Sequence, residues 1–351
     1  MTNVSSPAFR LKRLIRRFRG CSVGVVGDLM LDRYLWGTAS RLSPEAAVPI
    51  IDFVEQSECL GGAGNVAANL AALGGKVSAF GVSGNDEPGR ALRACLRRAA
   101  IDDRGVVSIL QRVTTVKTRI IARHQQVVRV DCERREPPPP ANEEKVLRQL
   151  FAALKNLDAL VLSDYDKGLV TDAFADRVLS AAHQRKVPVF VGLKTKKLYA
   201  YRGSRAVACN LKEASQLVGR PLTDEKSLEE AGRALLAHFG CGAVLITRGE
   251  MGMSVFEETT PRHLHIPATS FELTYARVGQ PGIAPGSKGR QVFDVTGAGD
   301  TVLSVLALAV AAGSSIPEAA LLANTAAGVV VGKLGTATLT PEELAHALDG
   351  H

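Results

Sequence analysis

Long apolar runs are absent from this chain of 351 residues, which argues against a membrane-spanning helix. The apolar stretch at residues 302–312 is too short to cross a bilayer and is typical of a buried helix. Aromatic residues make up only 5% of the chain, and no aromatic-rich basic motif indicates base stacking. Nor does an apolar N-terminal segment resemble a secretory leader. We therefore expect no membrane span and no nucleic-acid partner.

Paired cysteines are also missing. The six cysteines are scattered and none forms a C-x-x-C pair, and the seven histidines form no H-E-x-x-H pattern. Such spacing is poor for a structural metal site and fits buried thiols in a reducing compartment. The sequence thus favours a cytoplasmic protein without structural zinc.

Acidic residues are absent from one basic N-terminal segment, to which the formal net charge of +8 is partly due. Its cations are Arg10, Lys12, Arg13, Arg16, Arg17 and Arg19, and its apolar residues Leu11, Leu14, Ile15 and Phe18 recur at helical spacing. We favour an amphipathic helix that packs on the domain with a solvated basic face. Docking on an anionic surface and a transit peptide are the open alternatives.

Helical and strand patterns alternate along most of the chain. Short apolar runs at residues 22–28, 76–82, 159–163, 187–191, 206–209 and 243–246 are separated by helical patterns, and several end in polar residues. This alternation predicts an α/β fold with a doubly wound, mostly parallel sheet flanked by helices. Ligands bind such sheets beyond the carboxyl ends of the strands. We expect one domain over residues 1–351.

Three further segments predict a small second sheet. Residues 48–54 are rich in strand-forming residues, and residues 113–121 and 126–132 alternate as strands do. A sheet set apart from the main one would suit a lid that excludes water from a reaction. The lid strands are expected at about residues 46–56 and 112–132, inserted in the single domain.

The chain is organised around the string D-V-T-G-A-G-D-T at residues 294–301, which leads into the buried helix. Gly297, Ala298 and Gly299 leave backbone N–H groups uncovered at a helix start, which is a ready anion site. Asp300 places a carboxylate beside it, where it could accept a hydroxyl proton during phosphoryl transfer. A glycine-rich turn that merely caps a buried helix is the structural alternative.

Two other glycine-containing segments supply candidate sugar ligands. Asp28 and Asp32 follow the first strand, where they could bind hydroxyls or simply cap a turn. Gly62 and Asn65 open a helix of small residues, and small residues let a backbone approach a ligand closely. The Asn65 amide offers both a donor and an acceptor.

Taken together, these motifs resemble the ribokinase-like carbohydrate kinases over nearly the whole chain. Within that family the chain looks most like the D-glycero-β-D-manno-heptose 7-phosphate kinases. The D-x-T-G-A-G-D string indicates the broad family, whereas the N-terminal string and the C-terminal run are more specific. The matching segments are residues 27–34, 43–46, 48–49, 61–62, 65–67, 125–126, 129 with 131, 163–165, 167–168 and 326–336.

The resemblance implies transfer of phosphate from ATP, with Mg²⁺, to the anomeric hydroxyl of the heptose 7-phosphate, giving the 1,7-bisphosphate used for lipopolysaccharide precursors. Asp300 would be the base, and Gly297, Ala298 and Gly299 the anion hole. Asn210 and Glu213 match the N-x-x-E motif that organises Mg²⁺, with Glu213 acting through water. A requirement for a monovalent cation stays open.

The resemblance also assigns the remaining contacts and the partners. Thr247, Arg248, Gly249, Gly252 and Asn324 would surround the nucleotide; Asp28, Asp32, Gly62, Asn65, Gln126, Arg129 and Asp164 would line the sugar site; Lys167 and Lys194 would bind the 7-phosphate. The lid strands resemble those that pair two subunits, so we expect a homodimer. Some relatives carry a fused nucleotidyltransferase, which these residues do not include, so we expect a separate phosphatase and nucleotidyltransferase.

Three departures from the family keep alternatives open. Gly192-Leu193-Lys194 stands where Asp-Pro-Lys is usual, Ala208-Cys209-Asn210 stands where Thr-Pro-Asn is usual, and residues 272–290 form a longer glycine- and proline-rich segment. A kinase of another sugar or sugar phosphate is one alternative. A non-catalytic regulator that binds a sugar phosphate or nucleotide is the other.

Overall fold

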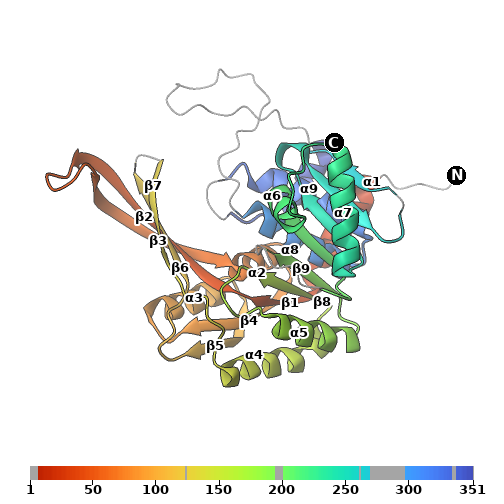
Figure 1. The fold of residues 1–351 in the computed structure, drawn as a ribbon, viewed down its shortest axis with the longest axis horizontal. Coiled ribbons are helices and arrows are strands. Elements are labelled where there is room, and N and C mark those ends of the chain that lie inside the picture. The colour runs from red at the N-terminus through yellow and green to blue at the C-terminus, as the bar shows by residue number, and fades with distance from the viewer. Residues whose placement is uncertain are drawn as a thin grey trace, which may run out of the picture.

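The computed structural model describes residues 7–122, 125–193, 201–260, 262–268, 297–333 and 337–350. Within these residues the strands form one sheet of nine strands and a second sheet of four. Figure 1 shows the four-stranded sheet projecting from the body of the molecule that contains the larger one. Residues 194–200 and 269–296, which include Lys194 and the 272–290 segment, lie outside the described residues.

The large sheet confirms the expected doubly wound, mostly parallel architecture. Its order is β13(Leu264–Ile266)-β12(Met253–Glu257)-β11(Ala243–Thr247)-β10(Ala206–Asn210)-β9(Val189–Leu193)-β8(Ala159–Asp164)-β1(Ser22–Gly27)-β4(Lys76–Gly84)-β5(Asp102–Ile109). All neighbours from β5 to β11 pair in parallel, whereas β12 and β13 are antiparallel. The sequence did not indicate β5, β12 or β13, because the edge strand β5 is partly polar and β12 and β13 are short.

Helices cover both faces of this sheet. One apolar cluster contains residues of α1(Pro7–Arg17), α2(Ala63–Ala72), α3(Glu87–Arg98), α8(Ala298–Ala311), α9(Ile316–Val330) and α10(Pro341–Ala347). The other contains residues of α4(Pro140–Ala153), α5(Asp172–Gln184), α6(Leu211–Leu217) and α7(Glu225–Phe239). Strand side chains alternate between them: Val161 belongs to the first, Leu160 and Leu162 to the second. Because these strands are buried on both faces, their sequences are apolar almost throughout.

The small sheet has the order β3(Pro49–Gly62)-β2(Leu29–Leu42)-β6(Val116–Ala122)-β7(Gln125–Cys132). We call these four strands the lid sheet. β3, β6 and β7 overlap the lid strands expected at about residues 46–56 and 112–132. The sequence missed β2, because its polar residues Asp32 and Arg33 suggested a loop. Pairing with β3 along nearly its whole length makes this segment a strand, which is a tertiary effect.

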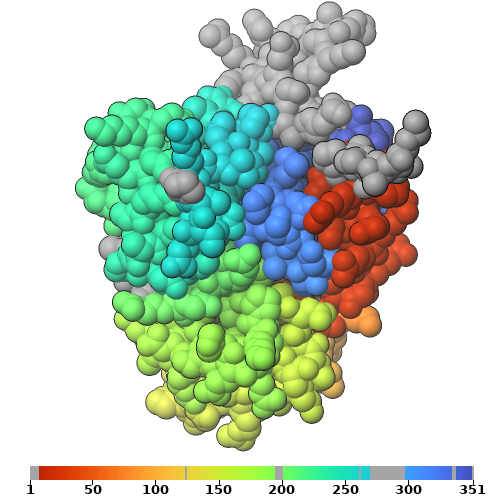
Figure 2. Space-filling view, turned by 90° about the vertical axis from the view of Figure 1, so that its right-hand side faces the viewer, coloured from red at the N-terminus to blue at the C-terminus, as the bar shows by residue number. Residues whose placement is uncertain are grey.

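The N-terminal basic segment packs as predicted. Leu11, Leu14, Ile15 and Phe18 are buried in the core. Arg10 pairs with Glu318 of α9 and Lys12 with Asp349, while Arg13 is exposed. Figure 2 shows this segment, in red, next to the C-terminal helices in blue. Among the helices that the structure describes, none has the length and apolar character needed to cross a bilayer.

The cysteines are free thiols, and most of them are buried as expected. Cys21, Cys95, Cys209 and Cys241 are buried, Cys59 is half-buried and Cys132 is exposed. Burial raises the pKa of Cys241 to about 12, so this thiol stays protonated and unreactive.

Candidate active site

A cavity of about 780 Å³ lies at the carboxyl ends of the parallel strands, where a ligand site is expected. Ser163 of β8, Gly192 of β9, Asn210 of β10 and Thr247 of β11 all line it. The first turn of α8 and residues of α9 and of the lid sheet complete the wall. This volume is within the usual range for a small-molecule site.

The start of α8 brings an anion site and a carboxylate together. Gly297, at the N-cap position, has a φ of +86°, a conformation that glycine adopts without strain. The first N–H groups of a helix have no acceptor within it, so those at the start of α8 are available to a ligand. Gly297, Ala298, Gly299 and Asp300 all line the cavity. The structure therefore brings the predicted anion hole and base to one wall.

The Asp300 carboxylate is held from two sides. The Tyr165 hydroxyl donates a hydrogen bond to its Oδ1, and the Asn65 amide donates one to its Oδ2 at 2.8 Å. The Asn69 side chain donates in turn to the backbone carbonyl of Asn65 at 2.9 Å. It accepts a hydrogen bond from the Thr301 hydroxyl at 2.9 Å. Burial, followed by the charge of Asp300 and the bond to it, raises the pKa of Tyr165 well above its usual value.

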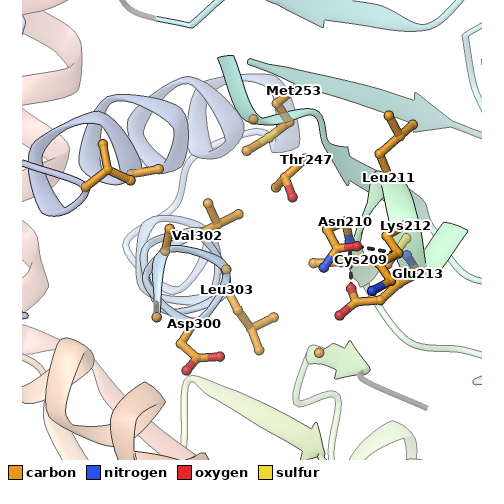
Figure 3. Close-up of a pocket in the computed structure, with 18 of the residues that line it drawn as sticks. Cys209, Asn210, Leu211, Lys212, Glu213, Thr247, Met253, Asp300, Val302 and Leu303 are labelled. Carbon is orange, nitrogen blue, oxygen red and sulfur yellow. Dashed lines mark hydrogen bonds between the residues drawn. The ribbon is translucent and has the colours of Figure 1, made fainter. Parts of the chain in front are cut away.

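Asn210 and Glu213 face Asp300 across the cavity (Figure 3). They form the capping box that begins α6: the Asn210 side chain accepts from the Glu213 N–H at 2.8 Å, and the Glu213 carboxylate accepts from the Asn210 N–H at 2.7 Å. This mutual bonding explains the N-x-x-E spacing, since N-cap and N3 residues satisfy each other's backbone. The motif holds one carboxylate rigidly at the cavity wall.

The other predicted nucleotide residues line the same end of the cavity. Thr247, Arg248, Gly249, Gly252 and Asn324 do so. The buried Arg248 guanidinium bonds to Glu225, to the Ser254 hydroxyl at 3.2 Å and to His265 Nδ1 at 3.2 Å. The Asn324 amide donates to the Pro267 carbonyl at 2.9 Å. Arg248 is thus held by side chains of three elements.

Cations of the lid sheet form the opposite end. Lys117 and Arg119 of β6 and Arg129 of β7 line the cavity together with Asp32 and Gly62. Arg119 Nη1 lies 3.0 Å from an Asp32 carboxylate oxygen, and both groups are buried. Arg119 is directly opposite Arg129 in the strand register. Like charges placed opposite each other are unfavourable, so this end of the cavity is suited to an anion.

An ion-pair chain along the lid sheet links these cations to others. Arg129 Nε lies 2.8 Å from Asp131, and Lys117 lies 3.1 Å from Asp131. Lys167 lies 2.8 Å from Glu133, which is also 3.7 Å from Lys117. Although burial alone would raise it, the bonds from Lys167 and Arg135 hold the pKa of Glu133 below its usual value.

Five of the predicted substrate-binding residues do not line the cavity: Asp28, Asn65, Gln126, Asp164 and Lys167. Asn65 lies behind Asp300, and Gln126 is an exposed residue of β7. Lys167 is engaged with Glu133. The buried Asp164 accepts from the Asp166 N–H at 2.9 Å and from the Tyr201 hydroxyl at 3.4 Å. Lys194 lies outside the described residues.

Asp28 holds a turn, which is the structural alternative to a hydroxyl ligand that the sequence left open. Its carboxylate accepts the N–H groups of Tyr165 at 2.9 Å, Lys167 at 3.1 Å and Leu169 at 3.4 Å. Burial raises the pKa of Asp28, and these backbone donors oppose that rise. The sequence could not show which turn Asp28 holds, because that loop is more than a hundred residues away along the chain.

Gly192, one of the departures from the family, also lines the cavity. A Cβ at this position would lie 2.4 Å from Cδ2 of the buried Leu303. The space that a side chain would need is therefore occupied by α8. Leu303 thus packs against Gly192, at the position where the family usually has an aspartate.

Sequence reasoning assigned no role to Lys117, Arg119 and Tyr165. The first two alternate along β6, so period 2 within a predicted lid strand places both on one face, and this pattern could have revealed them. Tyr165 belongs to a matched family motif, but nothing in the local sequence connects it to Asp300.

The fold and this cavity define a carbohydrate kinase of ribokinase-like architecture. The chain belongs to the pfkB family carbohydrate kinases, whose family model matches residues 22–343. It is therefore an ATP-dependent sugar kinase.

Curated relatives extend this match. The chain is 42% identical over 334 residues to the bifunctional protein HldE of Geobacter metallireducens, covering 95% of this chain and 64% of that protein. It is 43% identical over 324 residues to the HldE of Geobacter sulfurreducens, covering 92% and 62%. The chain thus spans less than two thirds of the length of these relatives.

Solved structures show the same fold. The chain is similar to Arabidopsis thaliana ribokinase complexed with ribose and ATP, with a TM-score of 0.69, 19% identity and coverage of 93% of this chain and 98% of that one. Phosphofructokinase-2 from Escherichia coli in complex with potassium gives a TM-score of 0.71 at 18% identity, with coverage of 94% and 98%.

Proposed function

We propose that this chain uses ATP to phosphorylate the anomeric O1 of D-glycero-β-D-manno-heptose 7-phosphate, giving the 1,7-bisphosphate. One observation carries the proposal: the Asp300 carboxylate and the uncovered N–H groups of α8 share one cavity wall, between a nucleotide end and a cationic lid end. The 42–43% identity to HldE proteins supports it.

The residues suggest how the reaction would proceed. Asp300 accepts the proton of the O1 hydroxyl as that oxygen attacks the γ-phosphorus of ATP. The bond between the γ-phosphorus and the β,γ-bridging oxygen breaks, and ADP leaves. The N–H groups at Gly297, Ala298 and Gly299 stabilise the charge on the transferred phosphoryl group, aided by the positive end of the helix dipole.

The donor set at the nucleotide end fits Mg²⁺ bound with ATP. Mg²⁺ keeps several waters and is bound through one or two carboxylates together with substrate phosphates. Glu213 supplies such a carboxylate, and no cluster of three or more His, Cys, Asp or Glu ligands exists among the described residues. When bound, the ion would neutralise charge on the β- and γ-phosphates. Thr247, Gly249, Gly252 and Asn324 would contact the nucleotide.

The lid end supports a phosphorylated sugar. Among the described lid residues that line the cavity, Lys117, Arg119 and Arg129 are cations and Asp32 is an anion. Guanidinium and ammonium groups are the usual partners of phosphate. We propose that Lys117 and Arg129 bind the 7-phosphate, with Asp32 and the Gly62 backbone near the sugar hydroxyls. Lys194 keeps its role in phosphate binding as a proposal from the resemblance.

The first test is ATP consumption with Mg²⁺ against heptose 7-phosphate, the unphosphorylated heptose, fructose 6-phosphate and ribose. We expect turnover with heptose 7-phosphate alone. Turnover with another sugar would keep the chemistry and reassign the substrate, for which Gly192 is the first residue to consider. ATP binding without any turnover would favour a regulator. Repeating the assay with K⁺ replaced by tetramethylammonium tests the monovalent-cation requirement.

We also propose a homodimer formed through the lid sheet. Phe53 and Val54 of β3 and Val130 of β7 are 64%, 65% and 55% exposed, an apolar content that is unusual for a projecting sheet. Sedimentation should give twice the mass of one chain, and Phe53→Asp with Val130→Asp should reduce it to one. Leu110→Asp, an exposed apolar position outside the lid sheet, is the control. A wild-type monomer at all concentrations contradicts the proposal.

Because ATP is the phosphoryl donor, we place the reaction in the cytoplasm, as a step toward lipopolysaccharide precursors. A separate phosphatase and a separate nucleotidyltransferase would act on the bisphosphate next. These assignments depend on the substrate identified in the assay.

A further inference from the structure

Tyr165 lies in the cavity wall, and its hydroxyl donates to Oδ1 of Asp300 while Asn65 donates to Oδ2. We propose that Tyr165 is the positioning residue of this kinase: it fixes the plane of the Asp300 carboxylate and favours its ionised form. The inference rests on the proposed role of Asp300 as the base. It adds a residue whose hydroxyl acts on that base.

The two donors come from separate elements, which makes the position of the carboxylate well defined. Asn65 belongs to α2, which packs against α8, whereas Tyr165 follows β8 and lines the cavity. The two bonds go to different oxygens of the carboxylate, Oδ1 and Oδ2. The arrangement therefore restrains the carboxylate at both of its oxygens.

The backbone around Tyr165 is itself fixed by a buried anchor. Asp28 accepts three N–H groups of the loop 165–169, including that of Tyr165 at 2.9 Å. Within this loop Asp166 has a φ of +57° and Gly168 a φ of +95°. Three donors that converge on one carboxylate determine the path of this tight turn. Asp28 thereby positions Tyr165, and Tyr165 positions Asp300.

The electrostatic surroundings show why such a donor is useful. Glu213 of α6 and Asp32 of β2 are two further acidic groups that interact with Tyr165. Arg119 of β6 pairs with Asp32, and Lys117 and Arg129 are engaged with Asp131. Nearby negative charge disfavours an ionised base, whereas a hydrogen bond to the carboxylate favours it. Since the pKa of Tyr165 lies well above its usual value, its hydroxyl remains a donor throughout the working pH range.

The test is Tyr165→Phe, assayed with whichever sugar the wild-type enzyme phosphorylates. We expect kcat to fall roughly 10-fold or more through misplacement of the base, with KM for ATP unchanged. The acidic limb of the kcat profile should move to higher pH by about one unit, because the ionised carboxylate loses a donor. A loss of fold alone would not move this limb.

Tyr201→Phe is the matched control. Tyr201 is a buried tyrosine that donates to the Asp164 carboxylate at 3.4 Å and does not line the cavity. It should keep the wild-type pH profile. An unshifted acidic limb in Tyr165→Phe, or an equal shift in Tyr201→Phe, overturns the inference. Failure of the proposed function is seen separately, because Asp300→Asn would then retain turnover.

Discussion

Asp300→Asn is expected to lower kcat by roughly 10²–10⁴, the usual contribution of a positioned general base. The asparagine keeps the size of the side chain but cannot accept the hydroxyl proton. ATP binding should stay close to wild type, because Asn210, Thr247 and Arg248 line another part of the cavity. Single-turnover kinetics and ATP titration by calorimetry measure the two effects independently.

The asparagine can be accommodated by its neighbours, which makes this variant informative. Asn65 and Tyr165 both donate to Asp300, so an amide oxygen can accept one of these bonds. The free energy of unfolding should therefore stay close to the wild-type value, while kcat falls. A matched control is Asp349→Asn, an exposed aspartate that pairs with Lys12 and does not line the cavity. Near-normal turnover in Asp300→Asn would show that the base is another group.

Replacing Lys117 and Arg129 together by methionine is expected to raise KM for heptose 7-phosphate by roughly 10²–10⁴-fold. Each hydrogen bond to a charged group contributes about 1.5–3 kcal/mol, and every 1.4 kcal/mol changes affinity about tenfold. KM for ATP should remain within about twofold. KM for the unphosphorylated heptose should change little. The variant therefore removes the preference for the 7-phosphate.

A control with the same change in charge separates this effect from long-range attraction. Arg104 and Arg177 pair with Asp102 and Glu144 at the surface, and neither lines the cavity. Their double replacement by methionine should leave both KM values unchanged at physiological salt, because charges beyond about 8 Å are screened. If KM for ATP rises as much as KM for the sugar phosphate, Lys117 and Arg129 do not form the phosphate site.

Local sequence determined much of this protein. The alternation of helical and apolar strand patterns predicted the doubly wound sheet, since each strand buried on both faces must be apolar throughout. The glycine-rich string placed Asp300 at the first turn of α8, because small residues, a helix start and a carboxylate follow one another in the chain. The N-x-x-E spacing likewise brought Asn210 and Glu213 together, as N-cap and N3 of α6.

Only the tertiary structure decided which side chains meet across long separations. Tyr165 reaches Asp300 over 135 positions, and Asp28 holds the loop that carries Tyr165 over 137 positions. β2 is a strand because β3 and β6 supply its hydrogen-bond partners, despite its polar residues. Hydrogen bonds and ion pairs form between whichever groups the packed sheet and helices bring into contact. Local propensity carries no information about contacts between residues that are so far apart in the sequence.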